Sequence, residues 1–436
     1  MLTRGPGGRA RPVGRAVLAA GLLLGAGVAI PAPALADGEG PTELAAFCSQ
    51  VADTEEPVAN PDPSTPLEQM RIDEIHRDYT RGAGVGVAVI DSGVAPSEYY
   101  DSEPGLQVVG QPGPLQEPHG TIVAGLIAGG RRGEGEGMGM GVAPDARIIG
   151  VRIVDNPEES DDDGLDLDGD FDPPDLVTAL RWVADNAGSR GIDVLNLSLT
   201  ADPSDDLRDA VRAVQDAGVI VVAATGNRSP DEELPEDEPV PGPFTTYPAA
   251  YPGVVGVSAY VPLDAEGGSA RYVLNTTNAD VAVPVQGGAS VVPNGSTCVV
   301  DAIATSWATP YVSGIVALLL AYFPDDDDAQ IVQRLLETAS GATDQRDVYT
   351  GFGLAQPIEA FTRQLTPARR TGELGLAQPA DDGGGAAPAP PERADALADA
   401  RDDFRWWGLL AGAVLVAAVV LRPLLRRLGT GRRTPG

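Results

Sequence analysis

The chain has 436 residues, 43% of them hydrophobic, and its formal net charge is −33 at pH 7. This length and apolar content allow one large domain or two ordinary ones, and they exclude a chain that is disordered throughout. The strong negative charge repels phosphate groups, so we expect no nucleic-acid partner and no attraction to anionic lipid headgroups.

The first 36 residues have the pattern of a secretory signal peptide. Four arginines precede the apolar run Ala16–Ile30, and Ala34–Ala36 supplies a small-residue cleavage site. A membrane anchor is the alternative, but the apolar run is short for one. The pattern therefore predicts that residues 1–36 direct export and are then removed.

The segment after the signal peptide, residues 37–80, is polar with scattered prolines, and we predict an N-terminal extension outside the core. Between residues 81 and 365, short apolar runs alternate with segments of helical periodicity. That alternation is typical of βαβ units, whose parallel strands are buried on both faces. The fold class is therefore α/β, with a mostly parallel central sheet and helices on both faces. The predicted strands are Gly84–Ile90, Ala146–Val154, Asp193–Leu199 and Val219–Ala224, and the predicted helices are Asp175–Ala187 and Asp205–Ala217.

Two acidic segments, residues 158–172 and 229–243, interrupt this alternation and are predicted insertions. The first lacks the spaced ligands of an EF-hand loop, with its Gly at the sixth position and Glu at the twelfth. A solvated acidic loop is therefore favoured over a calcium site, and we predict no metal ion and no other cofactor.

The C-terminal part begins with a Pro-, Gly- and Ala-rich linker, residues 366–403. The apolar segment 404–425 follows, with two tryptophans near its start and arginines at its end. Its length suits a helix that spans the membrane, and the arginines place the tail, residues 426–436, in the cytoplasm. A terminal amphipathic helix is the alternative, although no polar face is visible. The two ends together predict a single-pass cell-membrane protein whose main domain is extracytoplasmic.

The two cysteines, Cys48 and Cys298, suggest a disulfide in an exported protein. Such a bond would tie the N-terminal extension to the segment before Ser306. Two unrelated free thiols are the alternative.

Histidine is scarce, since only His76 and His119 occur. A mechanism that needs an imidazole base at neutral pH must use one of them. His119 stands at the entrance of a segment rich in small residues, which predicts a tightly packed helix. His76 lies in a polar amphipathic stretch and is predicted to be a surface or packing residue.

Two further side chains occupy positions suited to catalysis. Asp91 directly follows the strand that ends at Ile90, and α/β folds place ligands and catalysis at that end of a strand. Ser306 precedes a helical apolar run, where free N–H groups favour negative charge. Taken singly, Asp91 could cap a turn and Ser306 could cap a helix.

The segments around Asp91, His119 and Ser306 resemble, in this chain order, the signature motifs of the subtilisin-like serine proteases, or subtilases. The resemblance covers about residues 80–365 and implies a subtilisin-like fold and serine endopeptidase activity. Further segments that resemble landmarks of this family are Gly141–Pro144, Ala223–Asn227 and Tyr247–Pro252.

The resemblance also implies the role of each residue. Ser306 would be the nucleophile, His119 the proton carrier, and Asp91 the group that orients His119. Asn227 would hold the oxyanion together with the Ser306 N–H. The residues that would pair with the substrate backbone beside the S1 pocket are Ser198, Leu199 and Thr200.

Two residues near the nucleophile make the rate uncertain. The family usually has glycine where this chain has Ala304, and the extra methyl is tolerated only if the backbone φ is negative. Trp307 is bulky and is expected to restrict the neighbouring pocket.

The whole layout, from signal peptide to basic tail, resembles the mycosins, the subtilases of actinobacterial type VII secretion systems. The resemblance implies two kinds of partner, exported protein substrates and the type VII secretion membrane complex, and an extension that wraps the domain. The alternative function is a mainly structural subunit that stabilises this complex with little turnover. An α/β-hydrolase esterase does not fit, because Ser306 lacks a G-x-S-x-G elbow.

Overall fold

A computed structural model of the chain describes residues 64–364 except 110–114, 116, 131–138, 155–170, 229–239, 263–264, 266–267 and 342–345. The chain divides into two compact units, 1–376 and 377–436, and every described residue lies in the first. The predicted signal peptide, Cys48, the linker, the apolar segment 404–425 and the tail lie outside the described residues, as does most of each acidic insertion. No helix within the described ranges is long and apolar enough to cross a membrane.

A seven-stranded parallel sheet forms the centre of the described domain, in the order β2-β3-β1-β4-β5-β6-β7. The predicted parallel α/β sheet is therefore confirmed. A separate antiparallel hairpin, β8–β9, follows it in the chain. The strands are β1 (Gly86–Asp91), β2 (Asp101–Gln107), β3 (Arg147–Arg152), β4 (Val194–Leu197), β5 (Ile220–Ala224), β6 (Val255–Ala259), β7 (Val281–Val283), β8 (Gly288–Val291) and β9 (Thr297–Val300).

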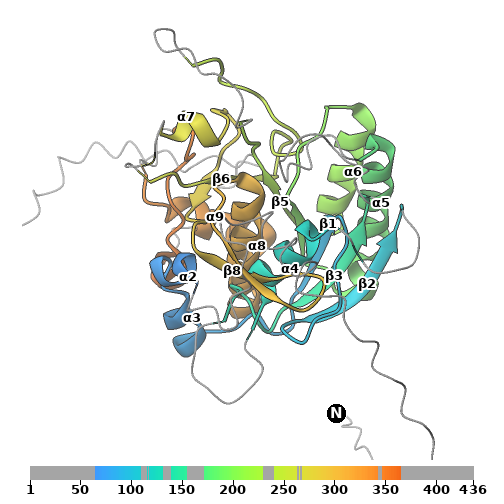
Figure 1. Cartoon of the computed structure of the whole chain (residues 1–436), viewed down its shortest axis with the longest axis horizontal. Coiled ribbons are helices and arrows are strands. Elements are labelled where there is room, and N and C mark those ends of the chain that lie inside the picture. Colours follow the sequence, from blue (N-terminus) through green and yellow to red (C-terminus); the bar gives the residue numbers. More distant parts are fainter. Residues whose placement is uncertain are drawn as a thin grey trace, which may run out of the picture. The chain divides into compact units, whose positions relative to one another are not determined.

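Helices cover both faces of the sheet, as Figure 1 shows. Alternate residues of β1 enter two different hydrophobic clusters, one containing Val87 and Val89 and the other containing Ala88 and Ile90. The first cluster includes helices α4 and α8, and the second includes α5 and α6. Burial on both faces explains why β1 is apolar from its start to Ile90. The helices are α2 (Thr65–Gln69), α3 (Ile72–Asp78), α4 (His119–Ala128), α5 (Pro173–Arg190), α6 (Asp205–Asp216), α7 (Ser269–Tyr272), α8 (Thr305–Tyr322), α9 (Asp328–Glu337) and α10 (Pro357–Thr362).

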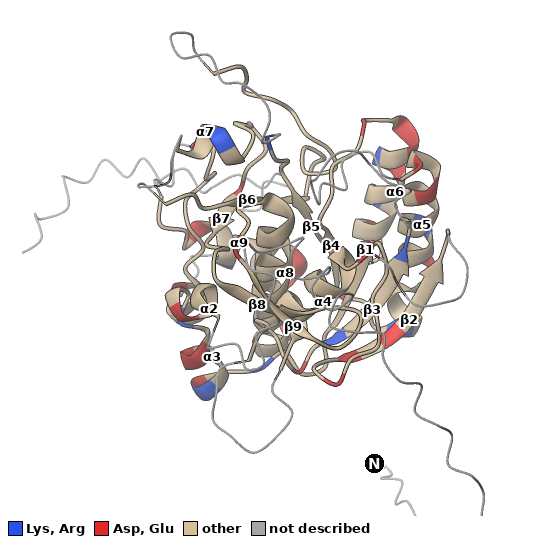
Figure 2. Cartoon of the chain, in the orientation of Figure 1, with Lys and Arg blue, Asp and Glu red and all other residues tan. Residues whose placement is uncertain are grey.

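The two layers of helices differ in character because they differ in burial. α6 is amphipathic, and the Ser204 hydroxyl caps it by accepting from the Leu207 N–H at 3.1 Å. By contrast, α4 is buried along its whole length, and α8 is buried from Thr305 to Leu319. Figure 2 shows that α4, α8 and strands β4, β5 and β6 carry no charged side chain. The interior around the candidate site is therefore apolar apart from the polar groups described below.

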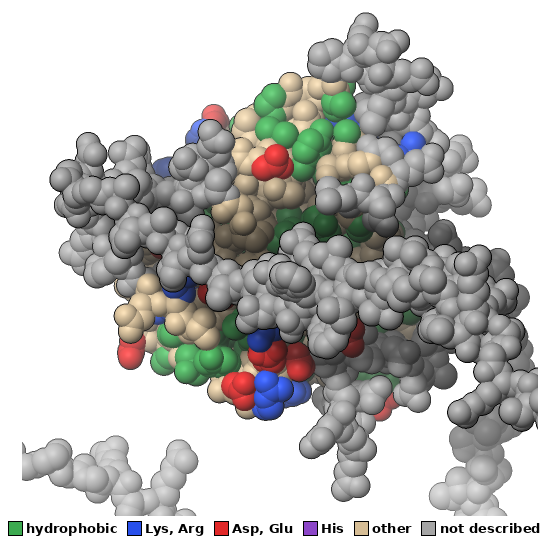
Figure 3. All heavy atoms as spheres, turned by 90° about the vertical axis from the view of Figure 1, so that its left-hand side faces the viewer, with side chains coloured by type: hydrophobic (Ala, Val, Ile, Leu, Met, Phe, Trp, Pro, Cys, Tyr) green, Lys and Arg blue, Asp and Glu red, His purple; other side chains and the backbone are tan. Residues whose placement is uncertain are grey.

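The end of the predicted N-terminal extension belongs to the core. Helices α2 and α3 bury Leu67, Ile72 and Ile75 completely against the cluster that contains α4 and α8. The expectation that residues 37–80 lack core elements is thus wrong for the described residues 64–80. It failed because both helices are short and their outer faces are charged. Figure 3 views the molecule from this side and shows acidic and basic groups next to one another. The ion pair Arg71–Glu74 joins the residue before α3 to the first turn of that helix.

His76 packs against the core from α3, as the sequence predicted. It is half-buried, and its Nε2 lies 2.7 Å from the Val142 carbonyl oxygen. Burial lowers the pKa of His76, chiefly by desolvation, so a neutral ring that donates this hydrogen bond is favoured. His76 has a structural contact and lies in a helix separate from the candidate site.

The helix that begins at His119 is held tightly by the β8–β9 hairpin. A Cβ atom at Gly125 of α4 would lie 2.1 Å from the Ser290 Oγ and 3.1 Å from the Val291 backbone nitrogen. The Ser290 hydroxyl itself donates to the Ile122 carbonyl oxygen at 2.6 Å, so it cannot move away without losing that bond. Glycine at position 125 therefore sets the separation between α4 and β8.

Gly125→Ala should lower the free energy of unfolding by about 1–3 kcal/mol, because overpacking forces the hairpin away from α4. Gly188→Ala is the matched control, since Gly188 lies in α5 with nothing within 4 Å of its added Cβ. The control should gain about 0.5–1 kcal/mol from helix propensity. Urea denaturation of the two variants checks this, and equal stabilities would show that α4 and β8 are not closely packed.

Candidate active site

Asp91 and His119 meet at the carboxyl edge of the sheet. Asp91 is the last residue of β1 and His119 the first of α4, and both side chains are fully buried. The His119 Nδ1 lies 2.9 Å from one carboxylate oxygen of Asp91 and 3.0 Å from the other. Both carboxylate oxygens can only accept when ionised, so this contact favours the tautomer with the proton on Nδ1. The structure thus brings together two of the three predicted catalytic residues.

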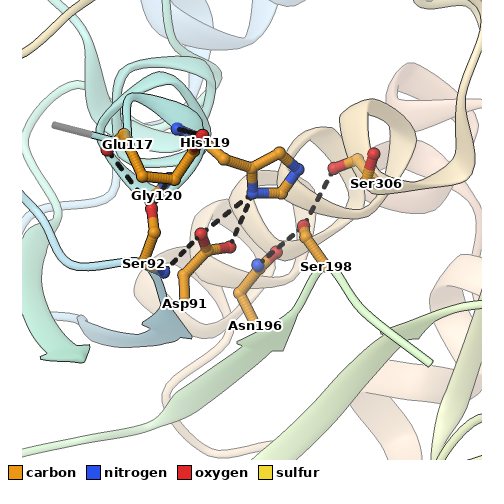
Figure 4. A network of polar contacts seen from close by, with 8 residues as sticks. All are labelled: Asp91, Ser92, Glu117, His119, Gly120, Asn196, Ser198 and Ser306. Atoms are coloured by element: carbon orange, nitrogen blue, oxygen red, sulfur yellow. Dashed lines mark hydrogen bonds and ion pairs between the residues drawn. The ribbon is translucent and has the colours of Figure 1, made fainter. Parts of the chain in front are cut away.

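A set of short contacts fixes the start of α4 against Asp91 (Figure 4). The Ser92 N–H donates to the Asp91 Oδ1 at 2.7 Å, and the Ser92 Oγ accepts from the Gly120 N–H at 3.0 Å. The Glu117 carboxylate accepts from the His119 N–H at 3.1 Å. Backbone donors at this helix start, which have no partner within the helix, are therefore satisfied locally.

Gly120 is required by this close approach. A Cβ atom there would lie 2.4 Å from the Gly93 carbonyl oxygen and 2.9 Å from the Asp91 Oδ1. Any larger residue would push α4 away from β1 and so separate His119 from Asp91. A glycine directly after His119 is the sequence signal for this close approach. The parts that Gly120, Ser92 and Glu117 play in the site were not predicted from the sequence.

Ser306 is the second residue of α8, and it lies beside the imidazole ring. Figure 4 shows the ring edge that carries Nε2 turned toward Ser306, on the side opposite Asp91. The Ser306 Oγ is buried and has no hydrogen-bond partner within the described part of the chain. A buried hydroxyl without a partner is costly, and such groups are often found where a substrate or water completes the site. The three predicted catalytic residues are therefore neighbours.

Ala304 and Trp307 are the two residues near Ser306 whose effect on the rate the sequence left open. Ala304 has φ −146° and ψ 150°, which is extended backbone that any L-residue adopts, so its methyl group causes no backbone strain. Trp307 is buried, with 1% of its surface exposed, and its ring centroid lies 4.6 Å from that of His119. The Trp307 ring thus packs against the imidazole of His119, a contact that the sequence did not predict.

Asn227 follows β5 and contacts the residue before Ser306. Its Oδ1 accepts from the Thr305 N–H at 2.7 Å and from the Thr305 hydroxyl at 3.0 Å. Because a backbone N–H can only donate, the atom facing Thr305 must be the oxygen, which leaves the amide NH₂ to donate elsewhere. Asn227 is half-buried, and its NH₂ group takes no part in the contacts with Thr305.

The segment after β4, Ser198 to Thr200, lies beside Ser306. The Ser198 side chain is buried and its hydroxyl donates to the Ser306 carbonyl oxygen at 2.8 Å. Its side chain therefore serves the protein interior, and a substrate contact from Ser198 would have to come from its backbone. Leu199 is buried and Thr200 half-buried, and their predicted contact with substrate stays a prediction.

Two further predictions from the sequence were a disulfide between Cys48 and Cys298 and the absence of a metal site. Cys298 is buried in β9, whereas Cys48 lies outside the described residues, so their pairing stays a prediction. Among the described residues, no group of three or more His, Cys, Asp and Glu side chains is arranged to hold a metal ion.

Comparison with known proteins identifies the family of this chain. The model of the subtilase family, peptidase S8, matches residues 82–354. Mycosin-1 of Mycobacterium tuberculosis is 30% identical over 341 residues, which cover 70% of this chain and 74% of that protein. Subtilisin E of Bacillus subtilis is 30% identical over 286 residues, covering 63% of this chain and 65% of its own length.

A solved structure gives the same result in three dimensions. The MycP3 protease from the type VII (ESX-3) secretion system superposes with a TM-score of 0.56 and 28% identity, covering 71% of this chain and 90% of that chain. The chain therefore belongs to the subtilase family of serine endopeptidases, and within it to the mycosin subgroup.

Proposed function

We propose that Asp91, His119 and Ser306 form the catalytic triad of an endopeptidase that cuts exported proteins outside the cytoplasm, within a type VII secretion complex. The observation that carries this proposal is the imidazole of His119, held on one edge by both oxygens of Asp91 and turned on the other edge toward Ser306. The buried Ser306 hydroxyl, with no partner among the described residues, supports its role as nucleophile.

The reaction follows from these positions. His119 Nε2 takes the proton of the Ser306 hydroxyl as Oγ attacks the carbonyl carbon of the substrate. The proton passes from His119 to the leaving amine as the C–N bond breaks, which leaves an acyl group on Ser306. Water then attacks the acyl carbon and gives a proton to His119. The ester bond between this carbon and the Ser306 Oγ breaks, His119 returns the proton to Oγ, and the carboxylic acid product leaves. Asp91 stabilises the imidazolium that forms in each half of the reaction.

The oxyanion formed in each step needs hydrogen-bond donors. The NH₂ group of Asn227 is available because its Oδ1 is occupied by Thr305. The Ser306 N–H lies in the first turn of α8, where backbone donors have no partner within the helix. Thr305 lies next to Ser306 in α8 and is hydrogen-bonded to Asn227, so it holds these two donors near each other. Their proximity supports a joint role in stabilising the transition state.

Asn227→Asp removes this donor, because the carboxylate keeps an acceptor for Thr305 but loses the NH₂ group and adds a negative charge. We expect kcat to fall by about 10²–10³-fold with little change in KM. Asn278→Asp is the matched control, since Asn278 is also half-buried and its Oδ1 also accepts from a backbone N–H, that of Thr246. Steady-state kinetics on a peptide substrate measures both, and an unchanged kcat for Asn227→Asp would remove Asn227 from the oxyanion site.

The proposed setting rests on the relatives and on the ends of the sequence. The MycP3 protease is described as part of a type VII secretion system, and the chain shares the mycosin subgroup with it. The predicted signal peptide, residues 1–36, and the predicted membrane helix, residues 404–425, would hold the domain on the outer side of the membrane.

Complementation of a deletion strain with the full chain tests this function. Wild type should restore both secretion and the cleavage of exported proteins, detected as new protein N-termini by mass spectrometry. Ser306→Ala should restore assembly of the secretion complex but no cleavage. Unchanged cleavage with Ser306→Ala would refute the endopeptidase proposal. If the wild-type chain restored secretion but produced no cleavage of exported proteins, the structural-subunit function would be favoured instead.

A further inference from the structure

Helix α8 contains a proline four residues after Ser306. In an α-helix the carbonyl of residue i accepts from the N–H of residue i+4, so the partner of the Ser306 carbonyl would be the N–H of residue 310. Pro310 has no N–H, and it therefore leaves this carbonyl without its helical donor. The carbonyl belongs to the residue that carries the proposed nucleophile, and it is buried with it.

The missing donor comes from another element of the fold. The Ser198 hydroxyl, just beyond β4, donates to the Ser306 carbonyl oxygen at 2.8 Å (Figure 4). Ser198 is 1% exposed and 108 residues away in sequence, so the contact links the central sheet to α8. A side-chain hydroxyl thus occupies the place of a backbone donor at this one turn of the helix.

Neighbouring groups fix the direction of this hydrogen bond. The Asn196 NH₂ donates to the Ser198 Oγ at 3.0 Å, and the Ser313 hydroxyl of α8 donates to the Asn196 Oδ1 at 2.9 Å. Asn196 and Ser313 are fully buried. With its oxygen already accepting from Asn196, the single proton of Ser198 is directed to the Ser306 carbonyl. The chain of three donors leaves β4 and α8 tied at two points.

We propose that Ser198 is a positioning residue for the nucleophile: its hydroxyl replaces the hydrogen bond that Pro310 removes, and so fixes the Ser306 peptide relative to the sheet that carries Asp91. This inference rests on the proposed catalytic function of Ser306. It gives Ser198 a side-chain role distinct from the backbone pairing with substrate that the sequence suggested. Because Ser198 acts on the backbone of Ser306, its loss should affect the chemical step and leave substrate binding nearly intact.

A double-mutant cycle with Pro310 tests this role directly. Ser198→Ala alone should lower kcat by about tenfold with KM nearly unchanged, because the buried carbonyl loses its donor. Pro310→Ala restores an N–H at the position that can donate to the Ser306 carbonyl. In the Pro310→Ala background, Ser198→Ala should therefore lower kcat by less than about threefold. An equal loss in both backgrounds would overturn the inference.

Thr338→Val is the matched control for the loss of a buried hydroxyl. The Thr338 hydroxyl also donates to a helix carbonyl, that of Arg334 at 2.6 Å, but in α9. It should lower stability while kcat per folded molecule stays at the wild-type value. A fall in kcat for Thr338→Val equal to that for Ser198→Ala would contradict a specific role of Ser198.

A second series keeps the inference testable if Pro310→Ala fails to fold. Ser198→Cys keeps a weaker donor, so kcat should decrease in the order Ser, Cys, Ala at constant KM. The same kcat for all three would overturn the inference. Reaction of wild type with a fluorophosphonate separates this outcome from failure of the proposed function. If wild type does not react at Ser306, the catalytic proposal itself fails.

Discussion

Ser306→Ala and His119→Ala should each lower kcat by about 10⁶-fold, the scale of such losses measured in subtilisin. Ser306→Ala removes the nucleophile, and His119→Ala removes the group that accepts its proton. The double variant should be no worse than either single variant, because the residues act as a unit. Hydrolysis of a peptide substrate by the purified full chain measures all three.

His76→Gln is the control for His119, since these are the only histidines in the chain. Glutamine keeps an N–H that can donate to the Val142 carbonyl, so the α3 contact survives and kcat should stay at the wild-type value. If His76→Gln lost activity while His119→Ala retained it, the assignment of the base would be wrong.

Asp91→Asn should lower kcat by about 10⁴-fold, the scale found for this change in a serine protease of another fold. The Ser92 N–H donates to the Asp91 Oδ1, so in the variant the amide oxygen should keep that place. The new NH₂ group then faces the His119 Nδ1, where Asp91 Oδ2 now lies at 3.0 Å. Because NH₂ can only donate, it favours the tautomer in which Nδ1 accepts and Nε2 carries the proton, and in that tautomer His119 cannot take the proton of Ser306.

Asp193→Asn is a matched control, because Asp193 immediately precedes β4 and contacts Gly86 at the end of β1 opposite to Asp91. The Asp193 Oδ2 accepts from the Gly86 N–H at 2.9 Å, and burial raises the pKa of this carboxyl. The variant should change stability and leave kcat per folded molecule unaltered. Wild-type activity in Asp91→Asn would show that the orientation of His119 does not depend on the carboxylate.

The central part of the fold was predictable because its signal is local. The apolar runs of β1, β3, β4 and β5, and the periodicity of α5 and α6, follow directly from burial on two faces or one. Strand β2 was missed because it is an edge strand with mostly exposed residues, and it includes a proline. Helices α2 and α3 could not be placed in the core from the sequence, since both are short and each buries few residues.

The three candidate catalytic residues could be predicted from the sequence, whereas the residues that hold them in position could not. Histidine scarcity and chain order singled out Asp91, His119 and Ser306, and the structure brings them together. The hydroxyl of Ser198 was not predictable, because its partner is a carbonyl freed by a proline more than a hundred residues away. The contact of the Trp307 ring with His119 was not predicted either, and the expected narrowing of a pocket by Trp307 stays a prediction. Such contacts depend on tertiary packing, which one sequence does not display.

Labelling with a fluorophosphonate, followed by peptide mass spectrometry, tests the central proposal most directly. The reagent forms a covalent bond with a serine only where a base activates it and an oxyanion site stabilises the product. We expect the adduct on Ser306 of the wild-type chain and none on the His119→Ala variant. A wild-type chain that stays unlabelled, or a label that persists without His119, would contradict an assembled triad.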